Sequence, residues 1–73
     1  MIFATLNKRD NGYNAYLIKN PNKRSQHTMG SWFKTSKEEA INVIEREANC
    51  RAITIDIWEA YDINGKQVSV EEV

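Results

Sequence analysis

The chain has little of what usually builds a chemical site or staples a small fold. Its 73 residues include one cysteine, Cys50, and one histidine, His27. A single cysteine excludes an internal disulfide, which in a small domain favours a reducing compartment. No Cys or His pair has the spacing of metal ligands, so we expect no metal site and no cofactor.

Catalytic patterns are equally scarce. The three glycines, at positions 12, 30 and 65, do not form a loop that would cradle a phosphate. Cys50 and His27 would suit a nucleophile pair, but a buried thiol between a helix and a strand is the more ordinary interpretation of Cys50. Glu38 and Glu39 fall in a first helical turn, where the helix dipole explains them. We therefore expect a protein that is not an enzyme.

Long apolar runs are also missing, because no window approaches the roughly 20 residues of a membrane span. The segment Ile2 to Leu6 is too short for the apolar part of a signal sequence. A chain of this length has room for one core. We expect a single α+β binding domain over residues 1–73 that is soluble, cytoplasmic and without a membrane partner.

The residues that are present predict the order β-β-β-α-β-β. The strands expected from β-prone composition and alternation are residues 2–6, 13–19, 27–33, 52–61 and 67–71. Turns are expected at Asp10–Gly12, where Asn-Gly tolerates a positive φ, and at Asn64–Gly65, with a polar loop over 20–25. Gly30 weakens the third strand and would mark a bulge.

The helix is the clearest element. Two overlapping capping boxes, Thr35 with Glu38 and Ser36 with Glu39, stand at its start. Apolar residues then share one arc at 100° per residue, namely Ala40, Ile41, Val43, Ile44 and Ala48. Glu47 interrupts this arc, which indicates that the helix has left the sheet by that point, that Arg51 pairs with Glu47, or that Glu47 contacts a partner. Because one helix covers one face, we predict a single antiparallel sheet of four to five strands with the helix packed on one side.

Strand alternation assigns the side chains to two faces of this sheet. The face under the helix is expected to carry Leu17, Met29, Phe33, Ile53, Ile55, Ile57, Val68 and Val70. The open face is expected to carry Tyr16, Trp32, Lys34, Thr54, Asp56 and Trp58, joined by Phe3 and Thr5 if Ile2, Ala4 and Leu6 point inward. An exposed aromatic cluster predicts an interface. The alternative is a strongly twisted sheet with the rings partly in the core.

The net charge of zero hides a division along the chain. Residues 1–37 have seven basic side chains and one acidic side chain, a net charge of +6, whereas residues 38–73 have three basic and nine acidic, a net charge of −6. Such asymmetry favours an electrostatic partner. The alternative is that the two halves interleave in space and cancel.

Two families share short patterns with the chain. The segment Gly30-Ser31-Trp32-Phe33-Lys34-Thr35-Ser36-Lys37-Glu38-Glu39-Ala40 resembles the strand-to-helix junction of AP2-like, arm-type DNA-binding domains of phage integrases. This resemblance implies a three-stranded sheet laid against DNA, with one helix behind it. The chain departs from that pattern because two acidic strands follow the helix, where such a domain continues into a linker.

A second resemblance covers roughly half of the chain. The segments Thr35-Ser36-Lys37-Glu38-Glu39-Ala40, then Cys50, Ile53-Thr54-Ile55 and Trp58-Glu59-Ala60-Tyr61-Asp62-Ile63-Asn64-Gly65-Lys66 are similar in order and spacing to small type I-F anti-CRISPR proteins of phages. This resemblance implies a non-enzymatic protein that binds a CRISPR surveillance complex on a surface that otherwise holds nucleic acid.

The leading hypothesis is a phage or mobile-element protein that inhibits a host nucleic-acid-handling complex, a protein or ribonucleoprotein, in the cytoplasm of a bacterial host. Its aromatic face (Tyr16, Trp32 and Trp58) and its acidic flank (Asp56, Glu59 and Asp62) would meet a basic surface. The first alternative is a DNA-binding domain that places Lys19, Lys23, Arg24 and Lys34 on phosphates. The second is a homo-oligomeric structural component, a homodimer through the aromatic face.

Overall fold

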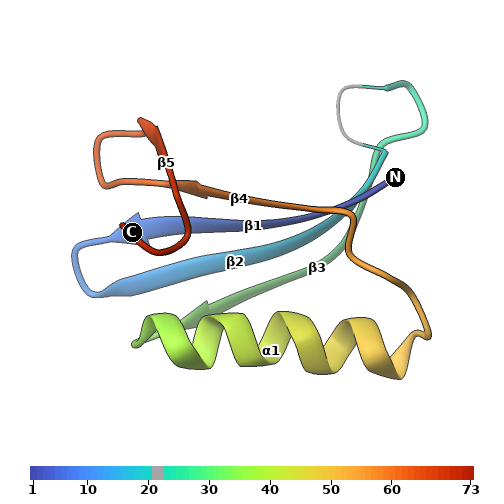
Figure 1. Cartoon of the computed structure of the whole chain (residues 1–73), viewed down its shortest axis with the longest axis horizontal. Helices are drawn as coiled ribbons and strands as arrows, with labels where there is room; N and C mark the ends of the chain where they lie inside the picture. The colour runs from blue at the N-terminus through green and yellow to red at the C-terminus, as the bar shows by residue number, and fades with distance from the viewer. Residues whose placement is uncertain (21–22) are drawn as a thin grey trace.

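The computed structural model describes residues 1–20 and 23–73 and has the predicted α+β fold, with one helix on one face of a five-stranded sheet (Figure 1). The elements are β1 (Ile2–Arg9), β2 (Gly12–Lys19), β3 (His27–Lys34), α1 (Lys37–Cys50), β4 (Ile57–Tyr61) and β5 (Gln67–Val68). The strand order is β3-β2-β1-β4-β5. The loop predicted over 20–25 includes Pro21 and Asn22, which lie outside the described residues.

One strand pair differs from the predicted antiparallel sheet. The β1–β2, β2–β3 and β4–β5 pairs are antiparallel, but β4 runs parallel to β1. The cause is the crossover from β3 through α1, after which β4 enters the sheet in the same direction as β3. Because β3 and β1 are both antiparallel to β2, β4 is parallel to β1 as well. The sheet is therefore mixed, and β1 lies at its centre.

The β1–β2 turn contains Asp10 and Asn11, because Arg9 pairs with Gly12. The predicted reason for this turn was wrong: neither Asn11 nor Gly12 has a positive φ, which occurs in the described residues at Asn20, Ala52 and Gly65. Gly12 is needed for space instead. A Cβ there would collide with the carbonyl oxygen of Lys34 and with the ring of Phe33.

The β2–β3 pair contains the bulge that Gly30 predicted. Leu17 pairs with Gly30 and Ile18 with Thr28, so Met29 is the extra residue. A Cβ on Gly30 would meet the indole of Trp32. Because the two residues are two positions apart on the same side of β3, the glycine leaves the space that the indole occupies.

Of the two capping boxes, the helix uses the second. Ser36 is the N-cap, and its Oγ accepts a hydrogen bond of 3.2 Å from the backbone N–H of Glu39. The buried side of α1 is made by Ala40, Val43, Ile44 and Ala48. Glu47 pairs with Arg51 at 2.8 Å, which accounts for the charge that interrupted the arc.

The strand predicted over 52–61 is shorter than expected. Only Ile57–Tyr61 pairs with the sheet, and residues 52–56 connect the helix to it. Ala52 takes a positive φ of 55°, and Ile53 packs against the core on the way back. The backbone of Asp56 donates a 2.9 Å hydrogen bond to the Ile2 carbonyl, while its Oδ2 accepts a 2.7 Å bond from the Ile2 N–H. The strand predicted over 67–71 is likewise reduced to Gln67–Val68.

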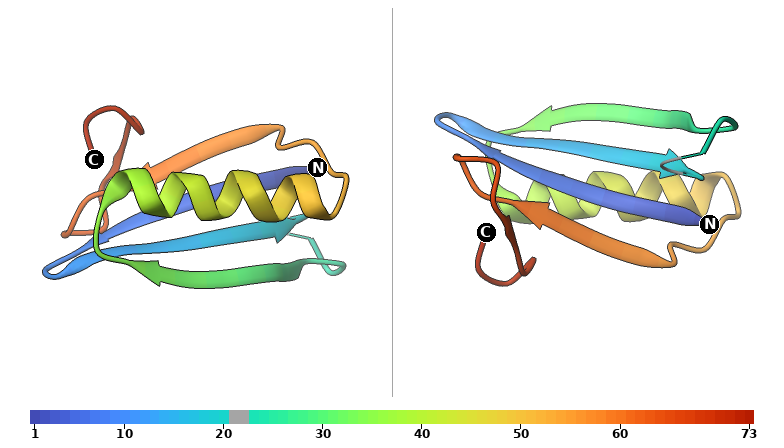
Figure 2. Two further views of the ribbon diagram at one scale, coloured as in Figure 1. Left: turned by 90° about the horizontal axis from the view of Figure 1, so that it is seen from below. Right: turned by 90° about the horizontal axis from the view of Figure 1, so that it is seen from above.

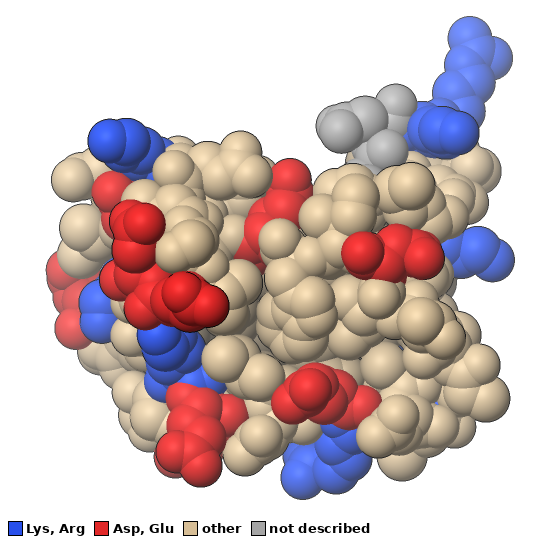
Figure 3. Space-filling model, in the orientation of Figure 1, with Lys and Arg blue, Asp and Glu red and all other residues tan. Residues whose placement is uncertain are grey.

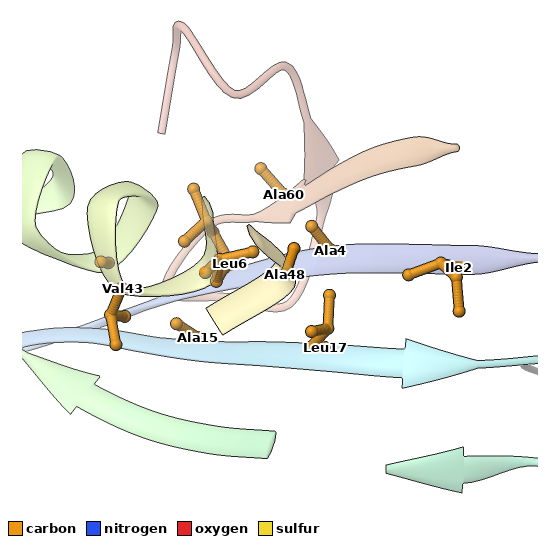
Figure 4. Close-up of a cluster of buried hydrophobic side chains, with 10 residues drawn as sticks. Ile2, Ala4, Leu6, Ala15, Leu17, Val43, Ala48 and Ala60 are labelled. Atoms are coloured by element: carbon orange, nitrogen blue, oxygen red, sulfur yellow. The ribbon is translucent and has the colours of Figure 1, made fainter. Parts of the chain in front are cut away.

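The core between helix and sheet is thin. Its buried members are Ile2, Ala4, Leu6, Ala15, Leu17, Ala40, Val43, Ile44, Ala48 and Ala60 (Figure 4). Half of these are alanines, and the largest fully buried side chains are only Leu6, Leu17 and Ile44. Most of the large apolar side chains therefore lie at the edge of this core or on the far side of the sheet.

Candidate docking surface on the open face of the sheet

The single helix divides the sheet into a covered face and an open face. Figure 2 shows α1 lying across one face, whereas no helix among residues 1–20 and 23–73 lies across the other. Along β1 the side chains of Ile2, Ala4 and Leu6 are buried on the helix side. Strand alternation then directs Phe3 and Thr5 to the open face, as predicted.

The strand register arranges the open face in three rows that run across the strands β3, β2, β1 and β4. The first row is Phe33, Asn14, Asn7 and Tyr61; the second is Ser31, Tyr16, Thr5 and Glu59; the third is Thr28, Ile18, Phe3 and Ile57. We call these twelve residues the open face. The first row has an aromatic residue at each end and two asparagines between them, the second is mostly polar, and the third is mostly apolar. Glu59 is the one charged side chain in the three rows.

Two residues at opposite sides of the open face are strongly exposed. Phe33, on β3, keeps 45% of its surface accessible and Ile57, on β4, keeps 37%. Both were predicted to lie under the helix, and both predictions were wrong. Phe33 pairs with Asn14 and rests on Gly12, whereas Ile57 pairs with Phe3. These pairings place them opposite to the helix.

The two tryptophans show the reverse error. Trp32 pairs with Ala15 and Trp58 with Ala4, so both lie on the helix side and pack against the core. The small side chains of these partners explain the placement, because the alanines and Gly30 leave room for an indole. Trp32 and Trp58 are therefore not part of the open face. Tyr16 is, and its binding role stays a prediction.

Two carboxylates of the acidic flank hold backbone N–H groups, and the third lies on the open face. Asp56 fixes the start of β4 through the Ile2 backbone, as described above. Asp62 closes the β4–β5 turn, because its Oδ1 accepts 2.9 Å hydrogen bonds from the backbone N–H groups of Asn64 and Lys66. Glu59 lies on the open face beside Tyr61, whose hydroxyl is 3.4 Å from Glu59 Oε1. Burial, and then the nearby Glu59 carboxylate, raise the pKa of Tyr61.

The sheet order keeps the two signs of charge apart. Lys19, Lys23, Arg24 and Lys34 lie on β2, β3 and the loop between them at one side of the sheet, and Asp56, Glu59 and Asp62 lie on or beside β4 at the other. Figure 3 views the β4–β5 side, where acidic side chains spread across the surface and most basic ones stand at its margins. The two halves of the sequence therefore do not interleave within the sheet.

The basic residues predicted to bind DNA do not form one surface. Lys19, Lys23 and Arg24 lie at the β2–β3 loop, whereas Lys34 is at the other end of β3, about 23 Å away along an eight-residue strand. Lys34 pairs with Tyr13 on the helix side, so its predicted position on the open face was wrong. There it lines a shallow cavity of about 190 Å³ with Glu39, Asn42, Val43 and Arg46.

Little in the described structure points to chemistry. Cys50 is exposed, contrary to the buried thiol that we expected. No cluster of three or more His, Cys, Asp or Glu side chains that could hold a metal occurs in residues 1–20 and 23–73. Within the same ranges, no helix has the length and apolar character needed to cross a membrane.

The comparisons with known proteins leave the argument to the geometry of the chain. No protein-family model, no curated protein and no solved structure matches it.

Proposed function

We propose that this is a non-enzymatic binding protein that docks its open face, together with the acidic β4–β5 side, on a basic surface of a protein partner. The observation that carries the proposal is the open face itself. One helix serves one side of a five-stranded sheet, and the other side presents Phe3, Tyr16, Ile18, Phe33, Ile57 and Tyr61 without a covering element.

The composition of the open face suits a protein interface. Aromatic side chains bury a large area and commonly dominate the free energy of binding. Phe33 and Ile57 are exposed and stand at the two sides of the open face, where a partner would contact both. Between them lie hydroxyl and amide groups that can form hydrogen bonds at a partly polar interface.

The charge of the open face and its surroundings defines the partner. Glu59 is the only ionic group in the three rows, and the acidic β4–β5 side continues from it. A complementary surface is rich in Lys and Arg and has apolar pockets. Surfaces that bind nucleic acid have such basic character, and a protein that occupies one would block it. The similarity to type I-F anti-CRISPR proteins favours a CRISPR surveillance complex as the partner.

Duplex DNA fits the same surface poorly. The three rows of the open face contain no Lys or Arg, and the basic residue that follows them on the same side is Arg9, at the end of β1. The candidate phosphate-binding residues are divided between the two ends of β3. Affinity for DNA comes largely from contiguous contacts with phosphates. The distribution of charge therefore favours a protein partner over direct binding to DNA.

The test uses a purified type I-F surveillance complex and its DNA target. The protein is expected to bind the complex and to lower its affinity for DNA. Ile57→Ala should weaken this inhibition about tenfold or more, because an apolar contact at the interface is lost. Ile63→Ala is the matched control, since Ile63 is 50% exposed but lies in the β4–β5 turn, outside the open face.

Two results would contradict the proposal. One is salt-sensitive binding of duplex DNA by the protein alone that is lost in Lys23→Glu/Arg24→Glu, which would make it a DNA-binding domain. The other is equal inhibition by Ile57→Ala and wild type. If the type I-F complex is not bound, nuclease-treated bacterial lysate extends the test: a specific partner must bind wild type, fail to bind Ile57→Ala, and be released by added nucleic acid.

A further inference from the structure

The open face is complementary to a copy of itself. We infer that the free protein forms a weak symmetric dimer in which two open faces pack against each other, with the twofold axis parallel to the strands and between β1 and β2. The inference rests on the proposed function in that both use the open face. It adds that a second copy of the chain covers the open face when no foreign partner is bound.

The rows of the open face carry the symmetry. A twofold axis along the strands reverses the strand order, so β3 faces β4 of the second copy and β2 faces β1. In the first row, Phe33 then meets Tyr61 of the second copy, and Asn14 meets its Asn7. An aromatic pair therefore closes each end of this row, and two amides that can bond to each other fill its centre.

The other two rows are complementary under the same operation. In the third row, Ile18 meets Phe3 of the second copy, which is an apolar contact, and Ile57 meets Thr28. In the second row, Tyr16 covers the position of Thr5, which is already buried in the single copy, and Ser31 meets Glu59. The Glu59 carboxylate thereby gains a hydroxyl donor instead of being buried without a partner, which would be costly.

Charge selects this axis over the alternatives. The operation lays the β2–β3 side of each copy, with Lys23 and Arg24 in its loop, over the β4 side of the other, with Asp56, Glu59 and Asp62 on or beside the strand, twice in the dimer. A twofold axis across the strands would instead lay the acidic sides on each other. Pairing two copies through either sheet edge would also bring like charges together, which opposes association. Two sheets packed face to face with their strands nearly aligned are a common arrangement.

The thin core explains why the open face needs a covering surface. The area of the open face sets the strength of the dimer. Half of the buried core residues are alanines, and the open face holds six larger apolar or aromatic side chains, namely Phe3, Tyr16, Ile18, Phe33, Ile57 and Tyr61. Four strands and six residues give a footprint of about 20 by 20 Å, well below the roughly 800 Å² per partner of a standard interface. The dimer is therefore reversible, and it must dissociate before the open face binds a foreign partner.

The experiment is sedimentation equilibrium of the full chain over a wide concentration range. The average mass is expected to rise from that of one copy towards that of two. Ile57→Lys should weaken dimerisation at least tenfold, whereas the control Ile63→Lys, in the β4–β5 turn, should leave it unchanged. A wild-type chain that stays monomeric at the highest soluble concentration, or an equal loss in both variants, overturns the inference.

A charge-swapped pair tests the axis, because a variant that had only lost its fold would not regain affinity in the mixture. Ser31→Glu alone should weaken the homodimer because it faces Glu59 of the second copy. Mixed with Glu59→Lys, it should form a heterodimer that is at least tenfold tighter than either variant with itself; no preference for the mixture refutes the axis. Inhibition of the partner is measured below the dissociation constant of the dimer, where the chain is monomeric, so it does not depend on dimerisation. A wild-type chain that inhibits the partner but does not dimerise refutes only this inference and leaves the proposed function standing.

Discussion

The two tryptophans show how a small neighbour decides the position of a large residue. Trp32 occupies the space above Gly30 and beside Ala15, and Trp58 pairs with Ala4 on the same side of the sheet. An indole at the rim of a thin core covers apolar surface that alanines cannot fill. The position of these residues fits a role in stabilising the fold, and the proposed contacts with a partner belong to Phe33 and Ile57.

This assignment predicts opposite effects of two substitutions. Trp58→Ala should lower the free energy of unfolding by about 2 kcal/mol, less than the roughly 3–5 kcal/mol of a fully buried tryptophan because the residue is only half-buried. Ile57→Ala should change stability by less than about 1 kcal/mol and weaken partner binding instead. Urea melts and binding measurements on the two variants separate these effects. Selective loss of partner binding in Trp58→Ala would mean that the open face is not the docking surface.

At the scale of elements, the start of the helix was predicted from the sequence and the faces of two strands were not. Capping depends on residues three positions apart, which the sequence displays directly. Which side chains of a strand point to the helix depends on a choice between two alternations. A shift of one residue moves every side chain of the strand to the opposite face of the sheet. For β3 the choice between Trp32 and Phe33 rests on their pairing partners Ala15 and Asn14, which the sequence alone does not assign.

The row of Ile53, Ile55 and Ile57 shows a second limit of the same kind. Its alternation is that of a strand, but Ile53 and Ile55 pack against the core from the connection after α1, and only Ile57 begins β4. The signals that would have corrected the faces are the glycines. Gly30 lies two positions before Trp32 on one side, and Gly12 lies under Phe33 on the other.

The helix cap gives a prediction with a control one residue away. Ser36→Ala should lower the free energy of unfolding by about 1 kcal/mol, because the N–H of Glu39 loses its acceptor at the helix start. Thr35→Ala should change it much less, since Thr35 precedes the cap. Chemical denaturation of both variants checks the difference. Equal losses would show that the helix can use either capping box.

At the scale of the whole molecule, the sheet order turns a division along the sequence into a division in space. The order β3-β2-β1-β4-β5 leaves Lys19, Lys23 and Arg24 at the β2–β3 side and Asp56, Glu59 and Asp62 at the β4 side, while the glutamates of α1 belong to the face under the sheet. A partner that meets the acidic side is attracted over a distance set by ionic strength.

Salt should therefore act mainly on the rate at which the partner binds. Raising the salt concentration from about 50 mM to about 300 mM is expected to slow association about tenfold and to change dissociation much less. Surface plasmon resonance at several salt concentrations measures both rates. Glu71→Gln/Glu72→Gln, which removes two exposed acidic charges, should reduce this dependence. An association rate that does not change with salt would remove the acidic side from the encounter.

The parallel pairing of β1 with β4 also sets the order in which the chain can fold. The β1–β2 hairpin is local and can form early, but the other edge of β1 waits for residues 57–61. Ile2 and Asp56, which join the two strands at their start, are 54 positions apart in the chain. Closing so long a loop is slow relative to forming a hairpin. The rate-limiting step of folding should therefore be the arrival of β4, with the central strand of the finished sheet serving as an edge strand until then.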